Sequence, residues 1–109
     1  MIALTVLIIL CHLVTLICNL YRGSSSTIQK VAEACVAILG AVAAGLSLIP
    51  VGFAAGLSFS FIGFALMIFL NTVRYGMKEA HPEWQFTIYG ISGLGIILTI
   101  IASIIWYCV

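Results

Sequence analysis

The chain has 109 residues, of which 64% are hydrophobic and 6% are charged, and its formal net charge is +1. Its mean hydropathy of +1.33 excludes a soluble globular domain, and its low charge excludes the broad basic surface of proteins that bind nucleic acid tightly. A membrane-spanning helix needs roughly 20 apolar residues, so this length allows about four spans and no separate soluble domain.

The first predicted helix covers residues 2–20, a nearly continuous apolar run. A secretory signal peptide is the alternative, but no basic segment precedes the run and residues 21–27 contain no A-x-A cleavage site. His12 lies in the middle of the run, where we expect a hydrogen bond to a neighbouring helix; a proton relay is the alternative. Asn19 and Asn71, each near a predicted helix end, are interpreted as caps.

The second predicted helix covers residues 27–49 and follows a serine-rich connector. Ser26 and Gln29 have the spacing of a capping box, in which each side chain satisfies a backbone amide of the other. Glu33 is the one acid near a membrane-embedded position. Because it lies close to the helix start and one turn from Lys30, we interpret it as an interfacial acid; a functional carboxylate that accepts a proton or a cation is the alternative.

Pro50 interrupts the apolar sequence and separates the second helix from a third, predicted at residues 51–73. Proline removes a backbone donor and turns the preceding residue away from helical angles. The apolar stretch over residues 31–73 is about twice as long as one membrane span, so a turn at Pro50 is favoured over a kink. A fourth helix is predicted at residues 86–108, after a charged segment.

This charged segment, residues 71–86, is predicted to be the loop between the third and fourth helices. Its ionisable side chains are Arg74, Lys78, Glu79, His81 and Glu83. The last three alternate across a proline, but a metal site needs further ligands that the sequence does not offer, so we predict a solvated turn and no metal. The chain has no nucleophile elbow, phosphate loop or HExxH motif, so we expect neither an enzyme nor a cofactor.

The sequence therefore predicts an all-α fold, a single polytopic membrane module of about four hydrophobic helices with Gly/Ala-rich packing faces. Small residues let membrane helices approach closely. The glycines predicted at helix contacts are Gly40, Gly45, Gly52, Gly56, Gly63, Gly90 and Gly93. With four spans, all four basic residues lie on one side of the membrane, which the positive-inside rule identifies as the cytoplasmic side.

The cysteines, at positions 11, 18, 35 and 108, have no metal-binding spacing. Four free thiols are one interpretation, because free cysteine is an ordinary small apolar residue. If an intrachain disulfide forms, it is predicted to join Cys11 and Cys35. Counting outward from residues 20 and 27 puts these two at nearly equal depth in the antiparallel first and second helices.

The run from Val31 to Gly40, VAEACVAILG, is followed by Gly- and Ala-rich apolar helices that fold back about a short basic turn at Arg74 and Lys78. In this pattern residues 27–109 resemble the pilins of conjugative type IV secretion systems, including the small membrane pilins of crenarchaeal DNA-import machines. The resemblance implies a subunit that assembles with copies of itself into an extracellular tube, retains membrane lipid and lets single-stranded DNA pass without specific binding. The apolar first helix and the additional span at Pro50 depart from the pilin pattern.

Two other functions remain open. The segment Leu48–Gly52, LIPVG, followed by an aromatic- and glycine-rich helix, is similar to the third span of small multidrug resistance transporters, which share the length and four spans. The glutamate that couples transport in the first helix of that family is missing here, and Glu33 lies in the second helix. An accessory subunit of a large membrane complex, or a holin-like pore former, is the remaining alternative.

Overall fold

The computed structural model describes residues 2–22, 27–49, 53–76 and 83–108, which are helical except for a turn at residues 47–49. Its helices are α1 (Ile2–Arg22), α2 (Thr27–Leu46), α3 (Phe53–Gly76) and α4 (Glu83–Cys108). The prediction of an all-α fold of four helices is confirmed.

The helix bounds differ from the predicted ones by a few residues. They differ where the apolar run of the sequence and the helical hydrogen bonds end at different residues. α2 ends at Leu46, three residues before the predicted end. There the Ser47 hydroxyl donates to the carbonyl oxygen of Ala44 at 2.6 Å, and the amides of Leu48 and Ile49 bond three residues back at 3.1 Å. The chain tightens into a turn before Pro50 because these bonds replace the α-helical ones. α3 and α4 conversely extend into the charged segment, since polar residues end an apolar run without ending a helix.

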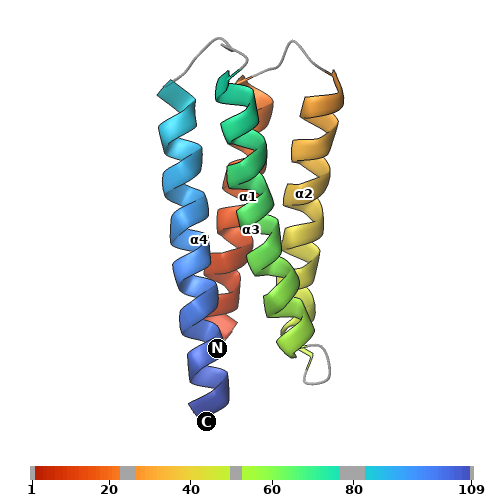
Figure 1. Ribbon diagram of the computed structural model, residues 1–109. Helices are drawn as coiled ribbons and strands as arrows, with labels where there is room; N and C mark the ends of the chain where they lie inside the picture. Colours follow the sequence, from red (N-terminus) through yellow and green to blue (C-terminus); the bar gives the residue numbers. More distant parts are fainter. Residues whose placement is uncertain (1, 23–26, 50–52, 77–82, 109) are drawn as a thin grey trace.

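The four helices form an up-down-up-down bundle (Figure 1). α1 packs against α2 and α4, and α3 likewise packs against α2 and α4. The bundle measures 46 × 20 × 18 Å. The start of α1 and the end of α4 lie at one end, whereas the end of α1 and the start of α2 lie at the other (Figure 1).

Among the described residues, three helices are long and apolar enough to cross a membrane: Ile2–Leu20 in α1, Ala54–Val73 in α3 and Phe86–Trp106 in α4. Their outward faces carry large apolar side chains in contact with the surroundings. The chain is therefore an integral membrane protein. The predicted fourth span on α2 stays a prediction, although its outward side chains Ile38, Leu39 and Val42 are also half or more exposed.

The core contains five layers, each with one buried residue from α1, from α3 and from α4 and one from α2 or the turn that follows it. Ring contacts define the central layer: the His12 ring stacks on Phe64, and the two rings lie against Gly40 and Gly95 respectively. Steps of three and four residues along each helix from this layer reach only buried positions. Named after their α1 residues, the layers are the Thr5 layer (Thr5, Ser47, Leu57, Ala102), the Ile8 layer (Ile8, Ala44, Ser60, Thr99), the His12 layer (His12, Gly40, Phe64, Gly95), the Thr15 layer (Thr15, Ala37, Met67, Ser92) and the Asn19 layer (Asn19, Glu33, Asn71, Ile88).

Alternating steps of three and four residues make the heptad pattern of a four-helix bundle, in which a and d positions meet at the axis. The pattern holds although the helices are apolar on every side, so side-chain size and polarity select the inward face here.

Candidate functional site

The His12 layer is the centre of the site and contains two aromatic rings. The ring centroids of His12 and Phe64 are 3.8 Å apart, and the ring planes differ by 10°. Nε2 of His12 lies 2.8 Å from Oγ of Ser60, one layer away on α3. His12 therefore reaches across the bundle axis from α1 to α3, in agreement with the expected hydrogen bond to a neighbouring helix.

Glycine provides the space for these rings. A Cβ atom at Gly40 would overlap the His12 ring, and one at Gly95 would overlap the Phe64 ring. Two large and two minimal side chains thus fill one cross-section of the bundle, which is how facing positions interdigitate in a densely packed core. The stacked rings close the bundle axis at this level.

The Asn19 layer lies two helical turns from the His12 layer and holds three strongly polar residues. Asn19 is 3% exposed, and Glu33 and Asn71 are fully buried. The cap interpretation of both asparagines is wrong, because each lies inside its helix and donates from Nδ2 to the carbonyl oxygen four residues back. These distances are 2.9 Å from Asn19 to Thr15 and 2.8 Å from Asn71 to Met67.

The interpretation of Glu33 as an interfacial acid is also wrong. Lys30, one turn earlier on α2, is exposed, whereas Glu33 faces the core with none of its surface accessible. It is therefore a core residue of the bundle and not an interfacial acid. The alternative considered from the sequence, a functional intramembrane carboxylate, fits this position.

Hydroxyl groups add acceptor oxygens to the remaining layers. Thr15 donates to the carbonyl oxygen of His12 at 2.7 Å, and Thr99 donates to that of Gly95 at 2.7 Å. Each hydroxyl thus donates its hydrogen to a carbonyl of its own helix. Its oxygen can still accept a hydrogen bond from a further group through its lone pairs. Three buried oxygens have no hydrogen-bond partner among the described residues: Thr5 Oγ1, Asn19 Oδ1 and Ser92 Oγ.

The glycines predicted at helix contacts divide into two groups. Gly40, Gly56 and Gly63 lie at contacts within the bundle. A Cβ at Gly56 would come within 2.6 Å of the Ala43 carbonyl oxygen on α2, and one at Gly63 within 3.4 Å of the Gly40 Cα. Gly45, Gly90 and Gly93 have no neighbouring atom within 4 Å of an added Cβ in the described part of the chain. Gly52 lies outside the described residues.

The equal depth predicted for Cys11 and Cys35 is wrong, and the structure agrees with the alternative of four free thiols. All four cysteines lie in described helices and are free thiols, with Cys11 buried and Cys35 exposed. The error is in the register, because His12 lies against Gly40 and Cys11 is therefore level with position 41. Position 35 lies six residues away, about 9 Å along the helix axis.

The polar-loop residues proposed from the sequence, Arg74, Lys78, Glu79, His81 and Glu83, have side chains outside the described part of the structure. Within the described ranges, no group of three His, Cys, Asp or Glu residues could hold a metal ion.

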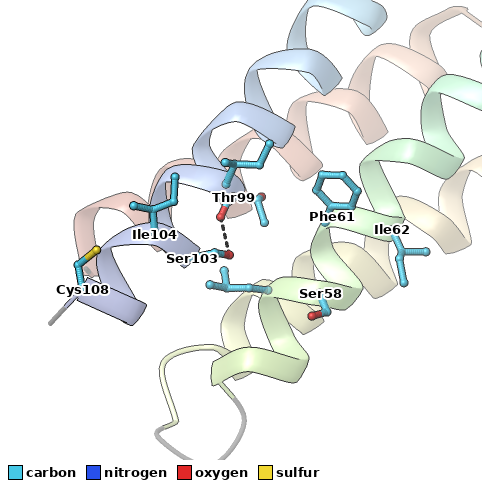
Figure 2. A pocket seen from close by; sticks show the side chains of 9 residues that line it. Ser58, Phe61, Ile62, Thr99, Ser103, Ile104 and Cys108 are labelled. Carbon is cyan, nitrogen blue, oxygen red and sulfur yellow. Dashed lines mark hydrogen bonds between the residues drawn. The ribbon is translucent and has the colours of Figure 1, made fainter.

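A groove of about 620 Å³ opens on the outer surface between α3 and α4 (Figure 2). Its side chains are mostly apolar, among them Phe61, Ile62 and Ile104. The Ser103 hydroxyl donates to the Thr99 carbonyl oxygen at 2.9 Å (Figure 2), and that of Ser58 donates to Ala54 at 2.8 Å. The groove lies on the lipid-facing side of two membrane-spanning helices, and its apolar lining suits an acyl chain. The bound lipid expected from the sequence stays a prediction.

Sequence reasoning missed the polar layers, although one signal was present. Thr5, His12 and Asn19 recur every seven residues in an otherwise apolar helix. This heptad spacing, continued on α4 by Ser92 and Thr99, identifies the inward faces. Gly95 was also missed, although it permits the closest approach at the central layer.

No family model, no curated protein and no solved structure matches this chain.

Proposed function

We propose that this integral membrane protein moves protons across the bilayer through the core of its bundle. One observation carries the proposal: every core layer contains a polar side chain, and two of these side chains, His12 and Glu33, are ionisable and fully or almost fully buried. The outward faces of the same helices are apolar.

A purely structural membrane bundle does not need this arrangement. Small residues and van der Waals packing are enough to hold membrane helices together, and polar side chains in a core are costly unless they are satisfied. Ionisable residues inside membrane segments are typical of ion and proton pathways. The polar column in this bundle runs from Thr5 near one end to Asn19 near the other.

The closed packing at the His12 layer favours protons over hydrated ions. The Phe64 ring fills the axis beside His12, so a wide aqueous pore is incompatible with this conformation. Protons need only a chain of hydrogen-bonding groups, which His12, Ser60 and the hydroxyls of neighbouring layers supply in part. The three oxygens that have no partner in the described ranges are suitable sites for the bridging waters that complete such a chain.

This proposal is closest to the transporter alternative. The sequence-based objection was that the first helix lacks a coupling glutamate. In this proposal α2 supplies the carboxylate, because Glu33 lies in the same layer as Asn19 of α1. The positive-inside rule puts this end of the bundle on the cytoplasmic side.

Proton flux into proteoliposomes tests the function. Purified protein is reconstituted with a pH-sensitive dye inside, and a potassium gradient with valinomycin drives proton entry in sodium-free buffer. We expect flux above that of protein-free liposomes. Glu33→Gln and His12→Asn should each reduce it about a hundredfold or more, because a positioned proton-transfer group typically contributes about 10²–10⁴-fold.

Ser58→Ala is the matched control, because this hydroxyl is exposed and bonded to its own helix outside the core. It should leave the flux unchanged. Wild-type flux equal to that of empty liposomes, or equal flux in wild type and both core variants, would contradict the proposal.

A second candidate is the self-assembling pilus subunit. The observation that favours it is the open space beside Gly45, Gly90 and Gly93, where a second copy can approach the helix backbone closely. Electron microscopy of the purified protein separates the two candidates. Regular filaments favour the pilus subunit, whereas uniform detergent-bound particles without filaments argue against it.

A further inference from the structure

The Asn19 layer brings polar side chains from three helices to one level. Asn19, Glu33 and Asn71 belong to α1, α2 and α3, and none is more than 3% exposed. Each lies seven residues along its helix from a member of the His12 layer, in which the His12 ring contacts Gly40 and Phe64. The same two-turn step on each helix therefore aligns the three side chains at the bundle axis.

The hydrogen bonds of both asparagines fix the direction of their amide groups. Asn19 Nδ2 donates to Thr15 O at 2.9 Å and to Met67 Sδ at 3.1 Å, while Asn71 Nδ2 donates to Met67 O at 2.8 Å. Both nitrogens are thus engaged with protein acceptors, and the carbonyl oxygen of Asn19 points elsewhere. Asn19 Oδ1 has no hydrogen-bond partner in the described ranges, and a buried acceptor in that state calls for a ligand.

Carboxylate and carboxamide oxygens, such as those of Glu33 and Asn19, are ligands that hard cations prefer. A carboxylate has about four acceptor positions, so any contact of Glu33 with another residue still leaves room for a ligand. Among the described side chains of this layer, Glu33 is the only ionisable one, and its carboxylate form carries a single negative charge. Since net charge is costly in an apolar interior, a single positive charge matches this layer better than a double one.

We propose that the Asn19 layer binds one monovalent alkali cation of the Na⁺ type through Asn19 Oδ1 and the Glu33 carboxylate. The site shares Glu33 with the proton pathway proposed above, and to that extent the inference rests on the proposed function. Binding itself does not depend on transport.

Equilibrium binding of radioactive Na⁺ to the purified full chain in detergent tests the site. Ionic strength is kept constant with N-methylglucamine chloride, a cation too large for the layer. We expect saturable binding of one Na⁺ per chain. Glu33→Gln and Asn19→Leu should each weaken the affinity at least about tenfold, because each removes a ligand oxygen or its charge.

Thr72→Val is the matched control, because Thr72 is adjacent to Asn71 but exposed on the outer face of α3. Its hydroxyl bonds to Tyr89 on α4 at 2.7 Å, outside the core, so Na⁺ affinity should stay within about twofold of wild type. Circular dichroism and gel filtration establish folding. If Asn19→Leu does not fold, the nearly isosteric Glu33→Gln still decides the result.

Two results would overturn the site: no saturable Na⁺ binding by the wild type, or wild-type affinity in the folded variants. The flux assay in sodium-free buffer keeps the two proposals distinguishable. Na⁺ binding without proton flux contradicts the transport role alone, and proton flux without Na⁺ binding contradicts the cation site alone.

Discussion

At the scale of single residues, Gly40 and Gly95 determine how closely the helices approach at the central layer. An alanine at either position would drive its Cβ into a stacked ring, His12 for Gly40 and Phe64 for Gly95. Overpacking of this kind typically costs about 1–3 kcal/mol. We therefore expect Gly40→Ala and Gly95→Ala to lower the free energy of unfolding by that amount, measured by SDS titration of the protein in detergent micelles.

Gly93→Ala provides the control on the same helix as Gly95. No atom of the described chain lies within 4 Å of its added Cβ, and alanine is favoured over glycine in a helix by up to about 1 kcal/mol. Gly93→Ala should therefore be neutral or stabilising. Combining Gly95→Ala with Phe64→Leu should recover part of the loss by removing the ring; equal destabilisation by all three glycine variants would show that ring contact is not the cause.

At the scale of elements, hydropathy was sufficient to predict four helices and their order. Apolar runs long enough to span a bilayer and the break at Pro50 leave few other arrangements. Hydropathy does not show where α2 ends, because the Ser47 hydroxyl and the turn after Leu46 act through hydrogen bonds. Hydropathy also does not show that α3 and α4 continue into the charged segment, because polar residues end an apolar run without ending a helix.

The inward faces were harder to predict than the helices. In a soluble bundle, apolar residues mark the core, but here both lipid-facing and core positions are apolar. The informative residues were the few polar ones, and Asn19 and Glu33 were interpreted as features of helix ends because they lie near them in the sequence. Helix register, which contacts such as His12 with Gly40 determine, cannot be counted from loop length. The error in the relative depth of Cys11 and Cys35 has this cause.

The orientation of each helix predicts which thiols react. Cys11 and Cys18 of α1 face the core, whereas Cys35 of α2 and Cys108 of α4 are exposed. Because alkylation needs access to the thiol, N-ethylmaleimide should modify Cys35 and Cys108 at least about tenfold faster than the α1 thiols in the folded protein. Peptide mass spectrometry measures the rates. All four should react after denaturation in SDS without reductant, and a thiol that stays blocked there would indicate a disulfide.

At the scale of the whole molecule, the bundle combines an apolar exterior with a polar axis. Its length of 46 Å exceeds the hydrocarbon thickness of about 30 Å, so both ends reach the interfacial regions. Three spans alone would put the two ends of the chain on opposite sides of the membrane. The start of α1 and the end of α4 lie at the same end of the bundle (Figure 1), an arrangement that requires α2 to span as well. The topology of the whole chain therefore depends on α2, the helix whose span stays a prediction.

Short epitope tags inserted singly into the full chain can test this topology. The basic residues Arg22, Lys30 and Arg74 belong to helix ends at one end of the bundle, and the positive-inside rule assigns that end to the cytoplasm. Tags after residues 24 and 79 should therefore be detected only in permeabilised cells. Tags after residue 51 and at the C-terminus should also be detected in intact cells. If tags after residues 24 and 51 report the same side, α2 does not cross the membrane. Glu33 then lies in an interfacial helix, and a proton path from the His12 layer through the Asn19 layer to the cytoplasm no longer follows.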